Sequence, residues 1–239
     1  MTEHVAVVGG GPAGLTAAIY TARAGLETTV YDGGEPILAR NAHLENVPGF
    51  PAGVNARTFL DATRQQAEDA GVAFVEASVE RVAATESGFR VETEDADTDA
   101  ADFVVAASWP DSSYLDDFEL SRIDRGSKTM LDVDEFGRTD ADGVYAAGRL
   151  ARQYHQTVVA AGHGATVGLT VIDDSDAPHY HDWVAPEGYF TGRDRDVPPG
   201  CEEIGEAERR ERERESLDAL AELSPAAPPT MHPSVTDDD

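Results

Sequence analysis

Lysine and cysteine are nearly missing from this chain of 239 residues, and each scarcity excludes a class of protein. Lys128 is the only lysine, and 18 Lys and Arg stand against 46 Asp and Glu, a formal net charge of −28. A field this negative repels a nucleic-acid backbone and an anionic membrane surface, so neither is expected as a partner. With Cys201 as the single cysteine, the chain cannot form an internal disulfide.

Long apolar runs are missing as well. No run reaches the roughly 18–20 residues that a membrane-spanning helix needs. No basic-then-apolar leader precedes the first predicted strand, which begins almost at Met1, so we expect a cytoplasmic protein. Little lysine beside abundant Asp and Glu resembles the composition of halophilic proteins, in which concentrated salt screens self-repulsion. An acidic protein of ordinary habitat is the alternative.

Glycine is plentiful near the start of the chain. The apolar residues 5–8 lead into a turn with Gly9, Gly11 and Gly14, and an alanine-rich stretch runs on to about Ala24. This order is typical of the strand–turn–helix element that holds the pyrophosphate of a dinucleotide. Gly9 permits the tight turn, Gly11 lets a phosphate approach the backbone, and Gly14 lets the helix pack closely on the strand.

An acidic residue follows the second predicted strand. Residues 27–31 have the composition of a strand, and Asp32 comes directly after them. This spacing from the glycines is the one at which a carboxylate accepts a hydrogen bond from an adenosine ribose hydroxyl. Asp32 could equally be a turn residue before Gly33.

The remainder of the chain predicts an α/β fold with a doubly wound parallel sheet. Asn55 is the expected N-cap of a helix over residues 56–70. Further predicted elements are β-type runs at 72–76, 78–83 and 89–93, buried strands at 103–107 and 143–148, and a helix of small residues at 157–172. The acidic stretch 92–102 separates the β-type runs from the next strand. We therefore expect the three runs to form a small antiparallel insertion.

The character of the chain changes after Ile172, because no further β-α-β unit is visible. Residues 1–176 are expected to form one domain, with halves 1–115 and 130–176. Residues 177–239 are expected to form an irregular and helical C-terminal extension. Its parts are an aromatic arm (Tyr180, Trp183, Tyr189 and Phe190), a charged helix at about 202–223 and a disordered tail at 225–239.

Three blocks stand in a recognisable order: the glycine turn at residues 9–14, the segment 44–51, and residues 143–148 followed by 154–164. Together they resemble the FAD domain of the thioredoxin reductase family of pyridine-nucleotide flavoproteins. The resemblance covers roughly residues 4–115 and 130–172. It implies a Rossmann-like FAD-binding domain with a parallel sheet and a small antiparallel β insertion.

The resemblance also implies a set of cofactor-binding residues. Gly9, Gly11, Pro12, Ala13 and Gly14 belong to the pyrophosphate turn, and Asp32 and Gly33 lie near the adenosine ribose. The backbone of Val82 lies near the adenine, and Asn46 near the isoalloxazine and ribityl end. Gln156 and Thr157 face the flavin pyrimidine edge, with Gly148 and Arg149 close by. His155 either lies near the flavin edge as a catalytic proton donor or electrostatic partner, or only fills space.

The chain departs from the family in what lies between the two halves. The family carries an NAD(P)H-binding domain there, whereas only residues 116–134 occupy this place. The redox-active Cys-x-x-Cys of that domain is also absent. We therefore expect that the nicotinamide domain is absent, that NAD(P)H does not bind in a domain of its own, and that this chain is not a stand-alone NADPH-dependent disulfide reductase.

Two further departures touch the flavin site itself. Arg149 stands where the family has an Asp that binds a ribityl hydroxyl, and Trp109 replaces the glycine of an Ala-Thr-Gly turn. Arg149 could pair with the pyrophosphate, and Trp109 could cover the surface that the nicotinamide domain covers in the family. Alternatively, both residues mark a site that has lost tight FAD binding.

The leading hypothesis is an FAD-dependent oxidoreductase that exchanges electrons with a separate protein or a small molecule. The first alternative is a non-catalytic binding or regulatory protein with a degraded FAD site. A second is a half-enzyme that gains a nicotinamide domain in trans, and the charged helix leaves a homodimer open. Cys201 is expected to be a packing cysteine, and His179, His181 and Asp182 are too weak a pattern to predict a metal site.

Overall fold

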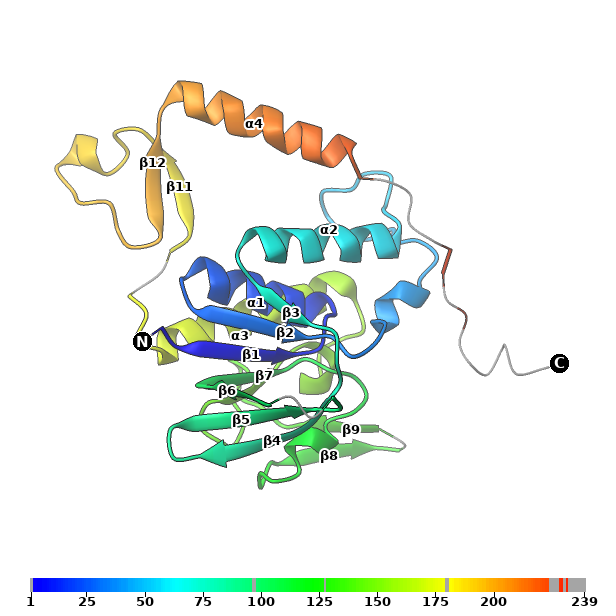
Figure 1. The fold of residues 1–239 in the computed structure, drawn as a ribbon. Helices are drawn as coiled ribbons and strands as arrows, with labels where there is room; N and C mark the ends of the chain where they lie inside the picture. The colour runs from blue at the N-terminus through cyan, green and yellow to red at the C-terminus, as the bar shows by residue number, and fades with distance from the viewer. Residues whose placement is uncertain are drawn as a thin grey trace.

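The protein is an α/β structure built on a five-stranded parallel sheet (Figure 1). The computed structural model describes residues 2–95, 98–126, 128–178, 181–223, 228–229 and 231. The sheet order is β10-β7-β1-β2-β3. The strands are β1 (His4–Val8), β2 (Glu27–Tyr31), β3 (Ala73–Val75), β7 (Phe103–Ala106) and β10 (Val144–Ala146).

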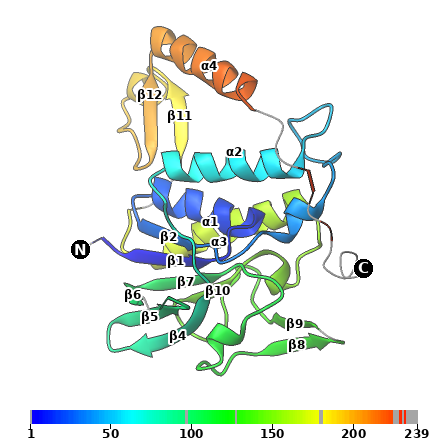
Figure 2. The same cartoon turned by 45° about the vertical axis from the view of Figure 1, so that its right-hand side comes forward.

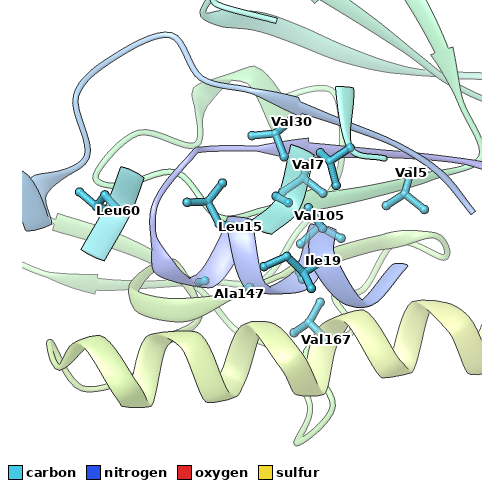
Figure 3. Close-up of a cluster of buried hydrophobic side chains, with 14 of the residues drawn as sticks. Val5, Val7, Leu15, Ile19, Val30, Leu60, Val105, Ala147 and Val167 are labelled. Atoms are coloured by element: carbon cyan, nitrogen blue, oxygen red, sulfur yellow. The ribbon is translucent and has the colours of Figure 1, made fainter. Parts of the chain in front are cut away.

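Both faces of the sheet are covered, which explains why its central strands β1 and β7 consist mainly of apolar residues. The helices α1 (Pro12–Arg23), α2 (Ala56–Asp69) and α3 (Thr157–Asp174) lie on one face, and an antiparallel sheet lies on the other (Figure 2). Because side chains alternate along a strand, Val5 and Val7 pack toward the helices, while Ala6 and Val8 pack toward the antiparallel sheet. Figure 3 shows Val5 and Val7 beside Ile19 of α1.

The stripe of small residues in α3 packs against another helix. A Cβ added at Gly164 would lie 2.1 Å from the carbonyl oxygen of Ala13, and one at Gly168 would lie 3.0 Å from that of Ala17. Both neighbours belong to α1. A stripe of this kind is compatible with tight helix–sheet packing or with approach to a flat cofactor. The structure instead shows that these glycines let the backbones of α3 and α1 come close.

The helix α2 begins where the sequence predicts. The side chain of Asn55 accepts hydrogen bonds from the backbone N–H groups of Arg57 (2.9 Å) and Thr58 (3.4 Å), which confirms Asn55 as the N-cap. Arg57 then donates to the carbonyl oxygens of Ala39 and Asn41 at 2.6 and 2.7 Å. These bonds tie α2 to the short 3₁₀ helix η1 (Ile37–Arg40) and to its C-cap residue Asn41.

The antiparallel insertion is present and contains two of the three predicted runs, but the prediction was wrong for the run at 72–76 and did not include the third strand. It consists of β4 (Val79–Thr85), β5 (Gly88–Thr93) and β6 (Thr98–Ala101). The run at 72–76 contributes β3, which pairs parallel with β2 in the main sheet. The acidic stretch expected to separate the runs holds β6 instead. At this edge position the first three residues face solvent and only Ala101 is buried, so the sequence of β6 carries no apolar pattern.

Regular structure also occurs between β7 and β10, where none was predicted. This region holds a 3₁₀ helix, η2 (Ser113–Leu115), and an antiparallel hairpin of β8 (Arg122–Arg125) and β9 (Lys128–Leu131). Leu131 is the only fully buried residue of the two strands. Strands this short and exposed form because they pair with each other, and composition does not reveal that pairing.

The chain after α3 builds a unit that projects from the main body (Figure 1). Strands β11 (Trp183–Pro186) and β12 (Cys201–Ile204) pair in parallel, with the 3₁₀ helix η4 (Thr191–Arg193) between them. Helix α4 (Glu206–Ala221) follows and has no buried residue. An ion pair of 2.6 Å between Arg23 in α1 and Asp182 connects this unit to the main body.

These elements correct the predictions for the C-terminal extension. The aromatic arm contains the strand β11, and the strand β12 lies just before the charged helix, which begins at Glu206 rather than near residue 202. Cys201 lies in β12, so no helix N-terminus acts on its thiol. Rings of Trp183, Tyr189 and Phe190 pack edge to face, with centroids 4.7–5.5 Å apart. Tyr180 and nearly all of the predicted tail lie outside the described residues, and the boundary at residue 176 stays a prediction.

No described helix combines the length and the apolar character that crossing a membrane requires. Among the described residues, no three His, Cys, Asp or Glu side chains come together as metal ligands. His179 of the weak metal pattern lies outside those residues, and Asp182 is engaged by Arg23. Nothing in the described part of the chain therefore favours a metal site there.

The turn after β11 depends on one carboxylate, and its stability should depend on pH. Burial favours the neutral form of Glu203, but hydrogen bonds from the Thr191 hydroxyl and from the N–H groups of Phe190, Thr191 and Gly188 outweigh it and lower the pKa to about 2. Because this pKa lies below the ordinary 4.5, the ionised group stabilises the turn above about pH 4.5, and the stabilisation is lost toward pH 2. Glu203→Gln should speed hydrogen exchange of these three amides at pH 7. Equal exchange in both proteins at pH 7 would contradict this expectation.

Candidate functional site

A cavity of about 420 Å³ lies at the carboxyl ends of the parallel strands. In open parallel sheets this edge is where ligands bind, because the strand order reverses there and the following loops diverge. The cavity is lined by five loop or helix-start segments: residues 8–13, 31–38, 107–109, 149 and 154–157, together with Ser78, Val79, Asp111, Tyr114 and Ala160. The segments come from both halves of the chain.

The glycines of the first turn have different structural duties. Gly9 adopts a φ of +115°, and a Cβ there would lie 2.9 Å from the backbone of Ala107 and Ser108. A Cβ at Gly14 would lie 2.0 Å from the carbonyl oxygen of Gly9. A Cβ at Gly11 would meet nothing within 4 Å, and Gly11 lines the cavity. The fold therefore requires glycine at positions 9 and 14, whereas at position 11 the missing side chain leaves open space in the cavity.

The start of α1 is suited to an anion. Gly11 is the N-cap and makes no side-chain capping bond, Pro12 stands in the first turn, and the first turn has no acidic residue. The N–H groups there lack side-chain partners, and the helix dipole adds a partial positive charge. A phosphate group placed at Gly11 would be stabilised by both effects.

Asp32 lies beside this turn at the end of β2. A Cβ at Gly10 would lie 2.4 Å from the Asp32 carboxylate, which shows how closely the two segments approach. Burial raises the pKa of Asp32, while Arg64 at 3.6 Å and the N–H groups of Gly10 and Gly34 oppose the shift. The carboxylate is thus oriented by backbone donors at the cavity wall, as an acceptor for a sugar hydroxyl would be.

The start of α3 brings together two residues that the sequence separates by 110 positions: Gln156 lines the cavity, and Asn46, which is not among the lining residues, contacts it. The Nδ2 of Asn46 donates to the Oε1 of Gln156 at 2.7 Å. Gln156 is the N-cap of α3 and makes no capping bond with its own side chain, and Thr157 is buried beneath it. The side chain of Gln156 is thereby oriented by Asn46, at a second helix N-terminus that faces the same cavity as α1.

Not every residue predicted from the sequence reaches the cavity. Val82 is fully buried in β4, and Ser78 and Val79 provide the wall there instead. Gly33 lines the cavity and packs against Ser78, which lies 2.3–2.5 Å from where its Cβ would be. Gly148 lies behind the wall, where a Cβ would be 2.7 Å from that of Ala13. Its role is close packing against the phosphate turn.

Some lining residues were missed by the sequence analysis. Tyr114 is buried, and its hydroxyl donates to the Ser108 Oγ at 2.8 Å, because Ser108 in turn donates to the carbonyl oxygen of Asp111 at 2.6 Å. Burial raises the pKa of Tyr114, so the hydroxyl keeps its proton. No sequence signal pointed to Tyr114. The altered turn at Trp109 was the available signal for Ser108.

Two histidines lie near the cavity with different roles. His155 lines it, and burial together with the positive charge of Arg149 lowers its pKa. It is therefore mainly neutral at pH 7, when it can accept a proton more readily than donate one. Burial also lowers the pKa of His163, whose Nδ1 accepts a hydrogen bond of 3.1 Å from the N–H of Gly148. His163 holds the start of the 3₁₀ helix η3 (Gly148–Ala151).

The two residues that depart from the family pattern contact each other. The Arg149 guanidinium lies 4.5 Å from the centre of the Trp109 ring. The Nζ of Lys128, in β9, lies 5.3 Å from the same centre. Two cations therefore meet one indole ring at the cavity wall, within the range of cation–π attraction.

These features place the chain among α/β proteins with a Rossmann-like strand–turn–helix element and a glycine-rich turn. Comparison with protein families then places the chain more closely. The model for pyridine nucleotide-disulphide oxidoreductase matches residues 44–164, about half of the chain. The model for an NAD(P)-binding Rossmann-like domain matches residues 7–70. The chain belongs to the pyridine nucleotide-disulphide oxidoreductase family.

Its relatives include thioredoxin reductases. It is 40% identical over 97 residues to NADPH-dependent thioredoxin reductase 3 of Arabidopsis thaliana, covering 38% of this chain and 18% of that one. It is 33% identical over 117 residues to thioredoxin reductase of Rickettsia bellii, covering 48% and 38%. The matches thus span well under half of these relatives. A solved thioredoxin reductase from Gloeobacter violaceus shares the fold, with a TM-score of 0.66, 17% identity, and coverage of 75% and 99%.

Proposed function

We propose that the chain is a flavoprotein oxidoreductase that binds FAD in the cavity at the carboxyl edge of the sheet. The observation that carries this proposal is one cavity lined by an open phosphate turn at Gly11, the carboxylate of Asp32 and the side chain of Gln156, which Asn46 orients from outside the lining. Two helix N-termini face this cavity, and an extended ligand with a central pyrophosphate fits such an arrangement.

The residues present fit FAD at its adenosine and phosphate portions. Asp32 would accept from the ribose, and the N–H groups at the start of α1 would hold the pyrophosphate. Bound FAD supplies reversible electron transfer at its ring system. At the far end, the α3 N-terminus and Gln156 favour negative charge near the ring, while the neutral His155 is placed to accept a proton at its imidazole.

The electron partner is proposed to be a separate protein or a small molecule. The segment 116–134 stands where the family carries its nicotinamide domain, and here its described part forms the β8–β9 hairpin. A hairpin of this size offers no second dinucleotide fold. We extend the proposal to a cytoplasmic, salt-adapted protein that works with a partner and without an NAD(P)H domain of its own.

The absorption spectrum of the protein, purified in high salt, tests this function. We expect flavin absorbance in the purified protein. If it is purified without flavin, we expect saturable binding of added FAD, measured by the quenching of fluorescence. We also expect that anaerobic NADPH alone leaves the bound flavin oxidised. Absence of both flavin absorbance and FAD binding would overturn the proposed function. Rapid bleaching by NADPH alone would instead overturn the need for a separate electron donor.

A non-catalytic binding protein on the same fold is the second candidate. The contact between Trp109 and Arg149 favours it, because a bulky ring and a guanidinium occupy positions that hold glycine and aspartate in the family. On this alternative the purified protein lacks flavin, and restoring the family residue by Arg149→Asp creates FAD binding. The same titration therefore separates the two candidates.

A further inference from the structure

Arg149 is the only cationic side chain among the described residues that line the cavity, because His155 is mainly neutral. The acidic residues on the same wall are Asp32, Glu35 and Asp111. A pyrophosphate carries about two negative charges, so a cavity with three carboxylates needs a compensating cation to hold it. The chain as a whole, with a net charge of −28, adds to the repulsion.

The position of Arg149 relates it to the phosphate turn. The preceding residue, Gly148, packs so closely on Ala13 in the first turn of α1 that a Cβ would lie 2.7 Å from the Ala13 Cβ. On the other side, Gly9 packs on the backbone of Ser108, next to Trp109, with 2.9 Å to an added Cβ. Arg149 and Trp109 thus flank the turn at residues 9–13 from two neighbouring loops.

The guanidinium of Arg149 is oriented without being neutralised. It stacks on Trp109 at 4.5 Å, and among the described residues no carboxylate forms an ion pair with it. The indole N–H of Trp109 is buried and has no hydrogen-bond partner in the described chain. Packing and cation–π attraction therefore hold the ring, while the donors of Arg149 stay available to a ligand. A stacked guanidinium also loses less freedom when it binds phosphate.

From this geometry we propose that Arg149, oriented by Trp109, binds the pyrophosphate of the bound dinucleotide. The inference rests on the proposed FAD binding and assigns it a specific ligand residue. Arg149 acts on the pyrophosphate by a charge-assisted, bidentate hydrogen bond. Trp109 is a positioning residue. The exchange of aspartate for arginine is then a change of ligand rather than the loss of one.

Three probes separate the phosphate from the rest of the cofactor: FAD, ADP and riboflavin. Arg149→Ala should lower the affinity for FAD and for ADP by about 10- to 100-fold, because hydrogen bonds to a charged group are lost. Arg149→Lys should recover part of the affinity, because it keeps the charge but not the fork. Riboflavin, which has no phosphate, should bind the wild type and Arg149→Ala equally. Arg149→Asp should lower the affinity for FAD more than Arg149→Ala does.

The matched controls are Arg152→Ala and Arg152→Asp. Arg152 lies three positions away, pairs with Asp132 at 3.2 Å and does not line the cavity. These variants make the same charge changes and should bind FAD within about threefold of the wild type. The single substitution Trp109→Leu should weaken FAD binding. In a protein that already carries Arg149→Ala, it should cause no further loss of affinity, because Trp109 acts through Arg149.

Each outcome decides between the two proposals. If the wild type binds FAD and Arg149→Asp binds equally or more tightly, the ligand role of Arg149 is overturned and the flavoprotein function stands. Equal losses for ADP and riboflavin also overturn it, because the effect would not reside in the phosphates. If the wild type does not bind FAD, the proposed function fails, whether or not Arg149→Asp restores binding. Circular dichroism and thermal unfolding of each variant confirm that the fold is retained.

Discussion

Replacing Gly11 by alanine should abolish most of the FAD affinity while leaving the fold intact. The new methyl group meets no protein atom within 4 Å, and Gly11 has an ordinary φ of −83° that alanine adopts freely. The methyl group instead occupies the space through which a phosphate reaches the N–H groups of α1. We expect the dissociation constant of FAD to rise about 100-fold, which corresponds to the loss of one to two charge-assisted hydrogen bonds. Fluorescence titration measures this change.

Two other glycines provide the controls for this experiment. Gly162→Ala, in α3, also meets no atom within 4 Å and lies outside the cavity lining, so it should leave the affinity unchanged and should not lower the melting temperature, since alanine is favoured over glycine inside a helix. Gly14→Ala places a methyl group 2.0 Å from the carbonyl oxygen of Gly9, so it should lower the melting temperature. Unchanged FAD binding in Gly11→Ala would show that the phosphate does not approach this turn.

Stability should fall steeply when salt is removed. With 46 acidic and 18 basic residues, one-to-one pairing leaves at least 28 negative charges without a basic partner. These charges repel one another over about 10 Å in 0.1 M salt but over only about 3 Å in 1 M salt. We expect the melting temperature to drop by about 10 °C between 2 M and 0.1 M KCl, the shift that about 3–5 kcal/mol produces in a chain of this size.

A nonionic solute separates charge screening from general stabilisation. Sucrose stabilises folded proteins because it is excluded from their surface, but it does not screen charge. Adding sucrose to the protein in 0.1 M KCl should therefore recover little of the lost melting temperature. A melting temperature that is the same in both salt concentrations would show an ordinary acidic protein and contradict the proposed salt adaptation.

The difference between Gly11 and Gly14 shows how much a local motif conveys by itself. The spacing of the glycines predicts a phosphate turn and assigns each glycine a duty. The structure has Gly9 and Gly14 in close backbone contacts and Gly11 beside open space, in agreement with those duties. Such agreement is expected where the requirement is local, because a turn, a helix start and a following strand involve neighbouring residues.

Local chemistry likewise predicts the cap at Asn55 and the buried strands of the main sheet. Capping needs only a side-chain oxygen and two N–H groups within three residues. Asn55 supplies the oxygen, and Arg57 and Thr58 supply the N–H groups. A strand buried on both faces needs an unbroken apolar run, and β1 and β7 have one. These elements are readable because their requirements lie within a few adjacent residues.

Tertiary structure alone decided the rest. Strands β6, β8 and β11 carry charged or exposed residues, and each exists because a partner strand satisfies its backbone hydrogen bonds. The contact between Trp109 and Arg149 joins loops 40 positions apart, and the Asn46–Gln156 bond joins segments 110 positions apart. The sequence determined a strand, a glycine-rich turn and a helix near the start of this chain, the pattern that is typical of dinucleotide-binding proteins. Only the folded sheet, by gathering its loops at one edge, decided which side chains share a cavity with that turn.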